Sequence, residues 1–312
     1  MNGWLPPPPL RATAAVIDAI DAGRPLVALE SSVLAQGLPE PANAQAHDQM
    51  AAAITAVGAE PVVTAVVRGV PSLGLEPADL ARFLARDGVA KLSARDLGAA
   101  MANGLDGATT VAATLALATH AGIRVFATGG IGGLHREPRF DESADLAELG
   151  RSPVIVVCAG AKSILDLPGT LERLETHGVP VIGYRTKEMP GFFTVGTGLP
   201  LSMHARTAGE IARVFLAGRS IGRPGALLVV QPPPAHAALP RELVEGAIAD
   251  ALAAASREGV RGAEVTPFLL AAVNRATGGR SMETNLALLE ANSRLAGEIA
   301  VELQQLATEE KG

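Results

Sequence analysis

Short apolar runs rich in β-branched residues alternate along this chain with longer alanine-rich segments. The runs are predicted strands, at residues 25–29, 62–67, 124–128, 154–158, 179–183 and 227–230. Most of them lack the polar–apolar alternation of a half-exposed strand, so both faces of the sheet are predicted to be covered. Such strands, separated by segments of helical length, are typical of α/β proteins.

The alanine-rich segments are predicted helices, at residues 42–57, 110–120, 163–176, 208–216, 240–258, 267–277 and 283–308. Glycine favours the left-handed conformation at a helix end, and several of these segments stop at one, namely Gly58, Gly122, Gly178 and Gly259. We therefore predict a layered α/β/α fold with a central, largely parallel or mixed sheet. Its ligand site is expected at the C-terminal ends of the strands, where open α/β sheets bind their ligands.

The chain is predicted to form a single catalytic α/β domain over residues 11–312. Residues 1–10 contain a proline run and are predicted to be a flexible tail. The chain has no internal repeat at the periods typical of solenoids, and neither Gly278-Gly279 nor the proline run at 232–234 resembles a domain linker.

Composition excludes several classes of protein. The net charge is −6 and aromatic residues make up 3% of the 312 residues, which argues against a nucleic-acid-binding surface. The one cysteine, Cys158, cannot form an intramolecular disulfide and is expected to be a small buried core residue. The N-terminus lacks a signal-peptide pattern, and polar residues interrupt every apolar stretch, so we expect a cytoplasmic protein without a membrane partner.

Lys162 gives the strongest indication of catalysis. It follows the predicted strand 154–158 after a short Ala-Gly-Ala segment, which places its amine at the edge of the sheet where ligands bind. An apolar environment lowers the pKa of an ammonium group, and a neutral amine can form a Schiff base. Lys162 is therefore a candidate covalent catalyst.

Glu30 ends another predicted strand, in the segment Glu30-Ser31-Ser32. A carboxyl group whose pKa is raised by burial can act as a general acid near neutral pH. For an isolated Glu-Ser pair, however, a capping or salt-bridged glutamate is the better explanation.

Lys91 and the segment 107–111 together suit a phosphate group. Lys91 supplies a positive charge, while Thr110 and Val111 lie at a predicted helix start, where a hydroxyl and free backbone amides bind anions. A solvated turn explains Lys91 about equally well, and a threonine cap explains Thr110. Only the combination with the other groups indicates a ligand.

Two further segments bear on cofactors. The glycine-rich segment 128–133 exposes its backbone to a close ligand, but neither a dinucleotide fingerprint nor a P-loop is present. Asp141, Glu142 and Asp145 lie close together, and one or two carboxylates with waters are typical of a Mg²⁺ or Mn²⁺ site. Acidic loops at helix starts are also common without a metal.

Together these segments resemble the pseudouridine-5'-phosphate glycosidases, a family also called indigoidine synthase A-like. The resemblance covers nearly the whole chain from about Pro25 onward. It rests on ordered blocks at residues 28–32, 37–41, 91–96, 107–112, 126–136, 157–166 and 266–270. Any one block is weak evidence, but all of them in order and at similar spacing are specific.

The resemblance implies reversible cleavage of the C–C glycosidic bond of pseudouridine 5'-phosphate, giving uracil and ribose 5-phosphate. It implies that Lys162 attacks ribose C1' to give a ring-opened imine, with Glu30 as proton donor. Asp141 would bind a divalent cation, usually Mn²⁺, with Mg²⁺ as the alternative. The substrate would be bound by the residues that match the family's motifs, which are Lys91, Thr110, Val111, His135, Ser143, Ala144, Asp145 and Asn285.

The resemblance also implies a homotrimer, and a separate kinase that makes pseudouridine 5'-phosphate. The loop 135–141 is shorter than the family pattern, which bears on the geometry of the metal, and segments 33–36 and 188–191 differ in ways that would adjust specificity. Two other functions stay open. One is a Schiff-base glycosidase or lyase acting on another phosphorylated sugar or nucleoside, and the other is a catalytically silent sugar-phosphate-binding accessory protein.

Overall fold

The computed structural model describes residues 10–136, 141–260 and 265–309. Within these residues, eleven strands form one sheet in the order β1-β4-β3-β2-β7-β9-β13-β11-β12, with β6 pairing with β3 and β5 pairing with β6. The strands are β1 (Arg11–Ala12), β2 (Leu26–Glu30), β3 (Glu60–Val67), β4 (Val70–Leu73), β5 (Val89–Leu92), β6 (Asp106–Thr109), β7 (Val125–Ala127), β9 (Ile155–Cys158), β11 (Val181–Tyr184), β12 (Met203–Ala205) and β13 (Leu227–Val230). A separate antiparallel pair joins β8 (Leu134–His135) to β10 (Leu165–Asp166).

Most neighbouring strands run parallel. The central strands β3, β2, β7, β9, β13 and β11 are parallel throughout, whereas β3 pairs antiparallel with β4 and β6. The predicted α/β fold with a central, largely parallel sheet is therefore confirmed. All six predicted strands are present, because an apolar run buried on both faces is a local signal of a central strand.

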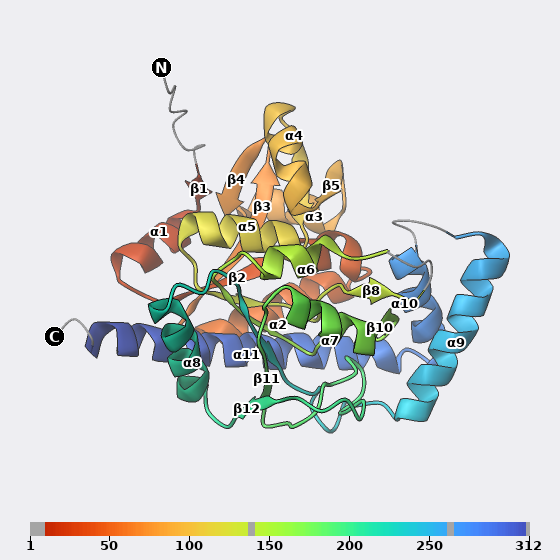
Figure 1. Ribbon diagram of the computed structural model, residues 1–312. Coiled ribbons are helices and arrows are strands. Elements are labelled where there is room, and N and C mark those ends of the chain that lie inside the picture. The colour runs from red at the N-terminus through yellow and green to blue at the C-terminus, as the bar shows by residue number, and fades with distance from the viewer. Residues whose placement is uncertain (1–9, 137–140, 261–264, 310–312) are drawn as a thin grey trace, which may run out of the picture.

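Helices cover both sides of the sheet. Figure 1 shows α2, α8 and α11 on one side of the sheet and α5 and α6 on the other. The long helix α11 packs on β2, β7 and β9, and α5 packs on β2 and β3. The helices are α1 (Ala14–Asp21), α2 (Ala42–Thr55), α3 (Pro77–Leu84), α4 (Leu97–Ala102), α5 (Val111–Ala121), α6 (Ala144–Leu149), α7 (Leu167–Thr176), α8 (Ala208–Ser220), α9 (Arg241–Glu258), α10 (Val265–Ala276) and α11 (Arg280–Glu309), with a π-helix η1 (Val33–Gly37) and a 3₁₀ turn η2 (Ala94–Asp96).

One predicted helix begins later than expected. The sequence predicts a helix over residues 163–176, but α7 starts at Leu167, and Leu165–Asp166 form β10 instead. Asp166 caps the helix by accepting a hydrogen bond from the N–H of Gly169 at 3.0 Å, and Pro168 occupies the first turn. Proline is favoured in the first turn of a helix, where its missing N–H would have no partner within the helix, so Asp166 and Pro168 together account for a start at Leu167.

Two small apolar clusters lie around Phe83 and around Leu92, but most of the core is one continuous apolar cluster that reaches from Val16 to Leu303. Cys158 is fully buried in it, which confirms the prediction of a core residue, and burial raises the pKa of its thiol to about 12. Of the predicted tail at residues 1–10, only Leu10 lies within the described residues, and it packs against this core. No helix among the described residues is long and apolar enough to cross a bilayer.

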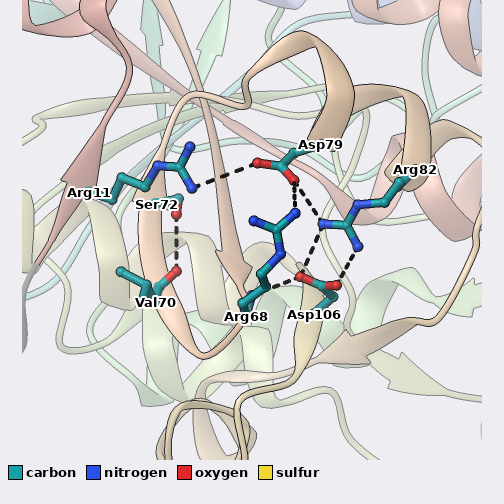
Figure 2. A network of polar contacts seen from close by, with 7 residues as sticks. All are labelled: Arg11, Arg68, Val70, Ser72, Asp79, Arg82 and Asp106. Carbon is teal, nitrogen blue, oxygen red and sulfur yellow. Dashed lines mark hydrogen bonds and ion pairs between the residues drawn. The ribbon is translucent and has the colours of Figure 1, made fainter.

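An ion-pair network fixes the branch of the sheet that carries β5 and β6 (Figure 2). Arg82 on α3 donates to Asp79 at 2.8 Å and to Asp106 on β6 at 2.5 Å. Arg68, in the β3–β4 turn, donates to Asp106 from its backbone N–H at 2.8 Å, and Arg11 on β1 lies 3.8 Å from Asp79. The network ties α3, β1 and the β3–β4 turn to β6, the strand on which β5 depends for its position.

Candidate active site

Three polar side chains follow neighbouring parallel strands at the same edge of the sheet. Glu30 ends β2, Thr128 comes directly after β7, and Lys162 follows β9. Because β2, β7 and β9 are adjacent and parallel, these three ends meet at the C-terminal edge of the sheet. A cavity of about 410 Å³ opens there, and all three residues line it.

Glu30 is buried, with 5% of its surface exposed. Its carboxyl oxygens accept hydrogen bonds from Ser32 Oγ at 2.6 Å and Thr128 Oγ1 at 2.5 Å. Burial raises the pKa of Glu30, while the charge of Lys162 and the two hydroxyl hydrogen bonds act to lower it. Glu30 therefore holds a proton to a higher pH than an ordinary glutamate does. Among the described residues it neither caps a helix nor forms an ion pair, which were the two alternatives that the sequence left open.

The backbone around Lys162 is fixed on both sides. Its N–H donates to Ile131 O at 3.1 Å, and its carbonyl accepts from Leu165 N at 3.0 Å. Arg136 donates to the carbonyls of Ser163 and Leu165, both at 3.2 Å. The half-buried Lys162 side chain thus enters the cavity from a loop that is anchored to the glycine-rich segment after β7.

Lys91 approaches the cavity from β5. Much of its side chain is exposed, yet the atoms crowded around the ammonium group lower its pKa by desolvation. The charge of Lys162 acts in the same direction, while Glu30 and Asp145 act in the opposite one. The ammonium groups of Lys91 and Lys162 and the carboxyl group of Glu30 are therefore close enough to influence one another. Two positive charges at one cavity favour the binding of an anionic ligand.

Asp145 joins the start of α5 to the glycine-rich segment. Its carboxylate accepts from Ala112 N at 2.9 Å and from Gly132 N at 2.8 Å. A Cβ on Gly132 would lie 2.2 Å from Ser143 Oγ, so only glycine fits there. Thr110 caps α5 through a long contact of 3.5 Å from Ala113 N. The predicted phosphate-binding helix start therefore lies beside the cavity, with the Ala112 amide already occupied by Asp145.

The structure brings four of the predicted site residues together around the cavity, namely Glu30, Lys91, Lys162 and Asn285. Six others lie on adjacent segments and do not contribute to the described cavity wall, and these are Thr110, Val111, His135, Ser143, Ala144 and Asp145. Of these, His135 is half-buried in β8, where its backbone pairs with Leu165 and its N–H donates to Asp141 O at 2.9 Å.

Asp141 offers a carboxylate for a cation. Glu142 is paired with Arg173 at 2.8 Å, and Asp145 accepts two backbone amides. Within the described part of the chain, Asp141 is the third carboxylate of this segment and is the one considered for a metal. The described residues contain no group of three or more His, Cys, Asp or Glu that could hold an ion. One carboxylate completed by waters and substrate oxygens suits Mg²⁺ or Mn²⁺. The residues present therefore fit a cation bound through a single side chain.

Several residues at the site were not predicted from the sequence. Asn292 on α11 is buried, donates to Thr128 O at 2.8 Å and accepts from Gln231 Nε2 at 2.9 Å. Phe192 and Phe193 line the cavity, and their rings form an edge-to-face pair with centroids 4.7 Å apart. The one signal for Asn292 is a polar residue within the apolar stripe of a long helix. No local pattern marks the two phenylalanines.

The chain has close relatives. Residues 15–302 match a family model described as indigoidine synthase A like protein. A pseudouridine-5'-phosphate glycosidase of Gemmatimonas aurantiaca is 64% identical over 293 residues, which cover 94% of this chain and 96% of that protein. A protein of the same name from Chloroflexus aurantiacus is 52% identical, with 95% and 99% covered. The crystal structure of the prealnumycin C-glycosynthase AlnA in complex with ribulose 5-phosphate matches with a TM-score of 0.90 at 38% identity, covering 97% of this chain and 100% of that one.

Proposed function

This chain belongs to the indigoidine synthase A-like family, and we propose that it is a pseudouridine-5'-phosphate glycosidase that reversibly cleaves the substrate to uracil and ribose 5-phosphate. One observation carries the proposal beyond the family. A buried glutamate with a raised pKa faces the same cavity as a lysine at the C-terminal edge of a parallel sheet. This pairs a proton donor with an amine nucleophile, as an imine mechanism requires.

In the proposed reaction, the Lys162 amine attacks ribose C1' and the C1'–O4' bond breaks. Glu30 donates its proton to O4', which becomes the hydroxyl of the opened sugar. The nitrogen passes a proton to the Glu30 carboxylate, and its lone pair then forms a C=N bond as the C1'–C5 bond breaks. Glu30 returns the proton to uracil C5. Water hydrolyses the imine, which releases ribose 5-phosphate and restores the amine. The lone pair of the lysine nitrogen drives the cleavage and the uracil ring accepts the electrons of the broken C–C bond, so the step does not need the heteroatom leaving group of ordinary glycosidase chemistry.

We assign the remaining site residues to substrate binding. Lys91 lines the cavity, interacts electrostatically with both Lys162 and Glu30, and suits the 5'-phosphate. Asn285 lines the cavity and offers an amide to the base or ribose. Thr110, Val111, His135 and Ser143 to Asp145 would complete the phosphate and ribose contacts from the segments beside the cavity.

A divalent cation, Mn²⁺ or Mg²⁺, is part of the proposal. Asp141 would hold it, and the cation would neutralise oxygen charge on the phosphorylated sugar. Asp141→Ala is expected to weaken Mn²⁺ binding measured by calorimetry, while Asp48→Ala, which removes an exposed carboxylate on α2, leaves it unchanged.

We also propose a cytoplasmic homotrimer that receives its substrate from a separate kinase. Light scattering coupled to size-exclusion chromatography tests the oligomeric state, and a mass of one or two chains would contradict the trimer.

The decisive experiment measures uracil release from pseudouridine 5'-phosphate with and without Mn²⁺. Lys162→Ala is expected to abolish release, and Glu30→Gln to slow it by about 100- to 10,000-fold, the range of general acid catalysis. Lys187→Ala removes an exposed lysine away from the cavity and is the matched control, which keeps wild-type activity.

Borohydride reduction in the presence of ribose 5-phosphate tests the imine directly. The only lysines in the sequence are Lys91, Lys162, Lys187 and Lys311, so mass spectrometry can locate the reduced adduct without ambiguity. The adduct is expected on Lys162. An adduct on another lysine, or none from a folded wild-type protein, would contradict the mechanism.

A second candidate function follows from one comparison. The C-glycosynthase AlnA was solved in complex with ribulose 5-phosphate, which favours C–C bond chemistry on another pentose 5-phosphate. Borohydride trapping carried out in parallel with ribulose 5-phosphate and with ribose 5-phosphate distinguishes the two candidate functions. Trapping of ribulose 5-phosphate, without uracil release from pseudouridine 5'-phosphate, would favour this second function.

A further inference from the structure

Phe192 has an unusual backbone conformation at the cavity. Its φ is +66°, in the left-handed region that a bulky side chain rarely adopts. The residue is 3% exposed, and its N–H donates to Ala159 O at 3.2 Å. Such a conformation persists only where the surroundings enforce it, and it is found preferentially where a ligand is bound.

The ring of Phe192 lies directly on the glycine-rich segment. A Cβ on Gly130 would lie 2.7 Å from ring carbons Cδ2 and Cε2, and 2.9 Å from Gly160 O. Only glycine allows this approach. On the neighbouring residue, a Cβ on Gly129 would lie 3.5 Å from Asn285 Oδ1. An aromatic ring and an amide therefore flank two consecutive residues that have no side chains.

This pair lies beside the reacting groups. Gly129 and Gly130 follow Thr128, which donates to Glu30, and Gly160 is two residues before Lys162. In the proposed reaction Lys162 attacks C1', the atom to which the base is attached. An aromatic ring offers no donor to a phosphate, but it offers a flat apolar face to a pyrimidine.

We propose that Phe192 is the wall against which the nucleobase stacks, with the Asn285 amide at the edge of the base. This inference rests on the proposed function and adds the subsite that selects the base. Uracil presents N–H donors and carbonyl acceptors at its edges, which an asparagine amide matches. Gly130 is a positioning residue, since its lack of a side chain lets the ring reach the floor of the cavity.

Phe192→Leu tests the proposal, because leucine keeps an apolar side chain but offers no aromatic face. We expect kcat/KM for uracil release to fall by roughly 5- to 150-fold, the range that stacking of a base on an aromatic residue provides. Borohydride trapping of ribose 5-phosphate, which needs no base, is expected to stay at the wild-type level. Phe192→Tyr retains the ring and should stay close to wild type in both assays. Phe215→Leu, at a buried position on α8, is the matched control, which should leave both assays unchanged.

Calorimetric titration of uracil in the presence of ribose 5-phosphate provides a readout that does not depend on turnover. Phe192→Leu should weaken uracil binding by a similar factor. Equal uracil affinity in the variant and the wild type would overturn the proposal. So would an equal loss of trapping and release, because the residue would then support Lys162 rather than the base. If the wild type releases no uracil, the proposed function fails on its own, and the titration still decides whether Phe192 binds the base.

Discussion

Thr128 donates a hydrogen bond of 2.5 Å to Oε1 of Glu30, although the two residues are 98 positions apart in the chain. The bond favours the carboxylate and lowers the pKa of Glu30 against the larger effect of burial. The end of β7 thus adjusts the protonation of the acid at the end of β2.

Thr128→Val is expected to shift the pH dependence of activity. Without the hydroxyl, the pKa of Glu30 rises further, so the proton needed for donation is kept to higher pH. The alkaline limb of kcat/KM for uracil release should therefore move upward in pH. Thr128→Ser keeps the hydroxyl and should retain the wild-type profile. If the alkaline limb of the pH profile does not move in the valine variant, the loss of activity at high pH does not come from deprotonation of Glu30.

Asp145→Ala is expected to lower the free energy of unfolding by about 2 to 4 kcal/mol, because two buried backbone donors, Ala112 N and Gly132 N, lose their acceptor. Urea denaturation at neutral pH measures the loss. Asp166→Ala is the matched control, since it removes an aspartate that caps α7 through one amide, and should cost about 1 kcal/mol. Equal losses in the two variants would contradict the linking role of Asp145.

Asn292→Leu should destabilise the protein by about 1 to 3 kcal/mol, because the buried carbonyl of Thr128 loses its donor. Thermal and urea unfolding measure this effect. Asn103→Ala, in which an exposed asparagine loses a bond to Ala99 O, should change stability by less than about 0.5 kcal/mol. A neutral result for Asn292→Leu would mean that the contact with Thr128 makes no net contribution.

Asp106→Asn is expected to reduce stability in a pH-dependent way. The hydrogen bond from Arg82 holds the pKa of Asp106 below its usual range. The ionised Asp106 carboxylate therefore stabilises the folded protein above the pKa of this group in the unfolded chain. This stabilisation is lost as the pH falls through its pKa in the folded protein. The free energy of unfolding of the wild type should exceed that of the variant by about 1 kcal/mol at pH 7, and this difference should become smaller at acidic pH. Uracil release at pH 7 should remain unchanged, while a difference independent of pH would contradict the ionic origin.

Part of the site could be predicted from residues alone. Glu30 and Lys162 were found because each follows an apolar strand, and the edge of a parallel sheet gathers such positions. Strands β4, β5 and β6 were missed because each is only four residues long. Strand β4 contains a proline, β6 contains a glycine, and β5 has exposed residues at its centre, so none of the three is a continuous apolar run. The π-helix η1 was missed because no local pattern distinguishes it from an ordinary turn.

The sequence by itself determined the fold class and the strand-end positions of the acid and the amine. Apolar periodicity and helix-ending glycines are local properties of a chain, so they can be read residue by residue. The tertiary structure alone decided how Glu30 is protonated and which side chains form the cavity. Those properties depend on burial and on partners from distant segments, such as Thr128, Asn292 and Phe192. The contact of the Phe192 ring with Gly130 and the hydrogen bond from the Thr128 hydroxyl to Glu30 leave no pattern in the sequence. Each contact exists only after β2, β7 and β9 have come together.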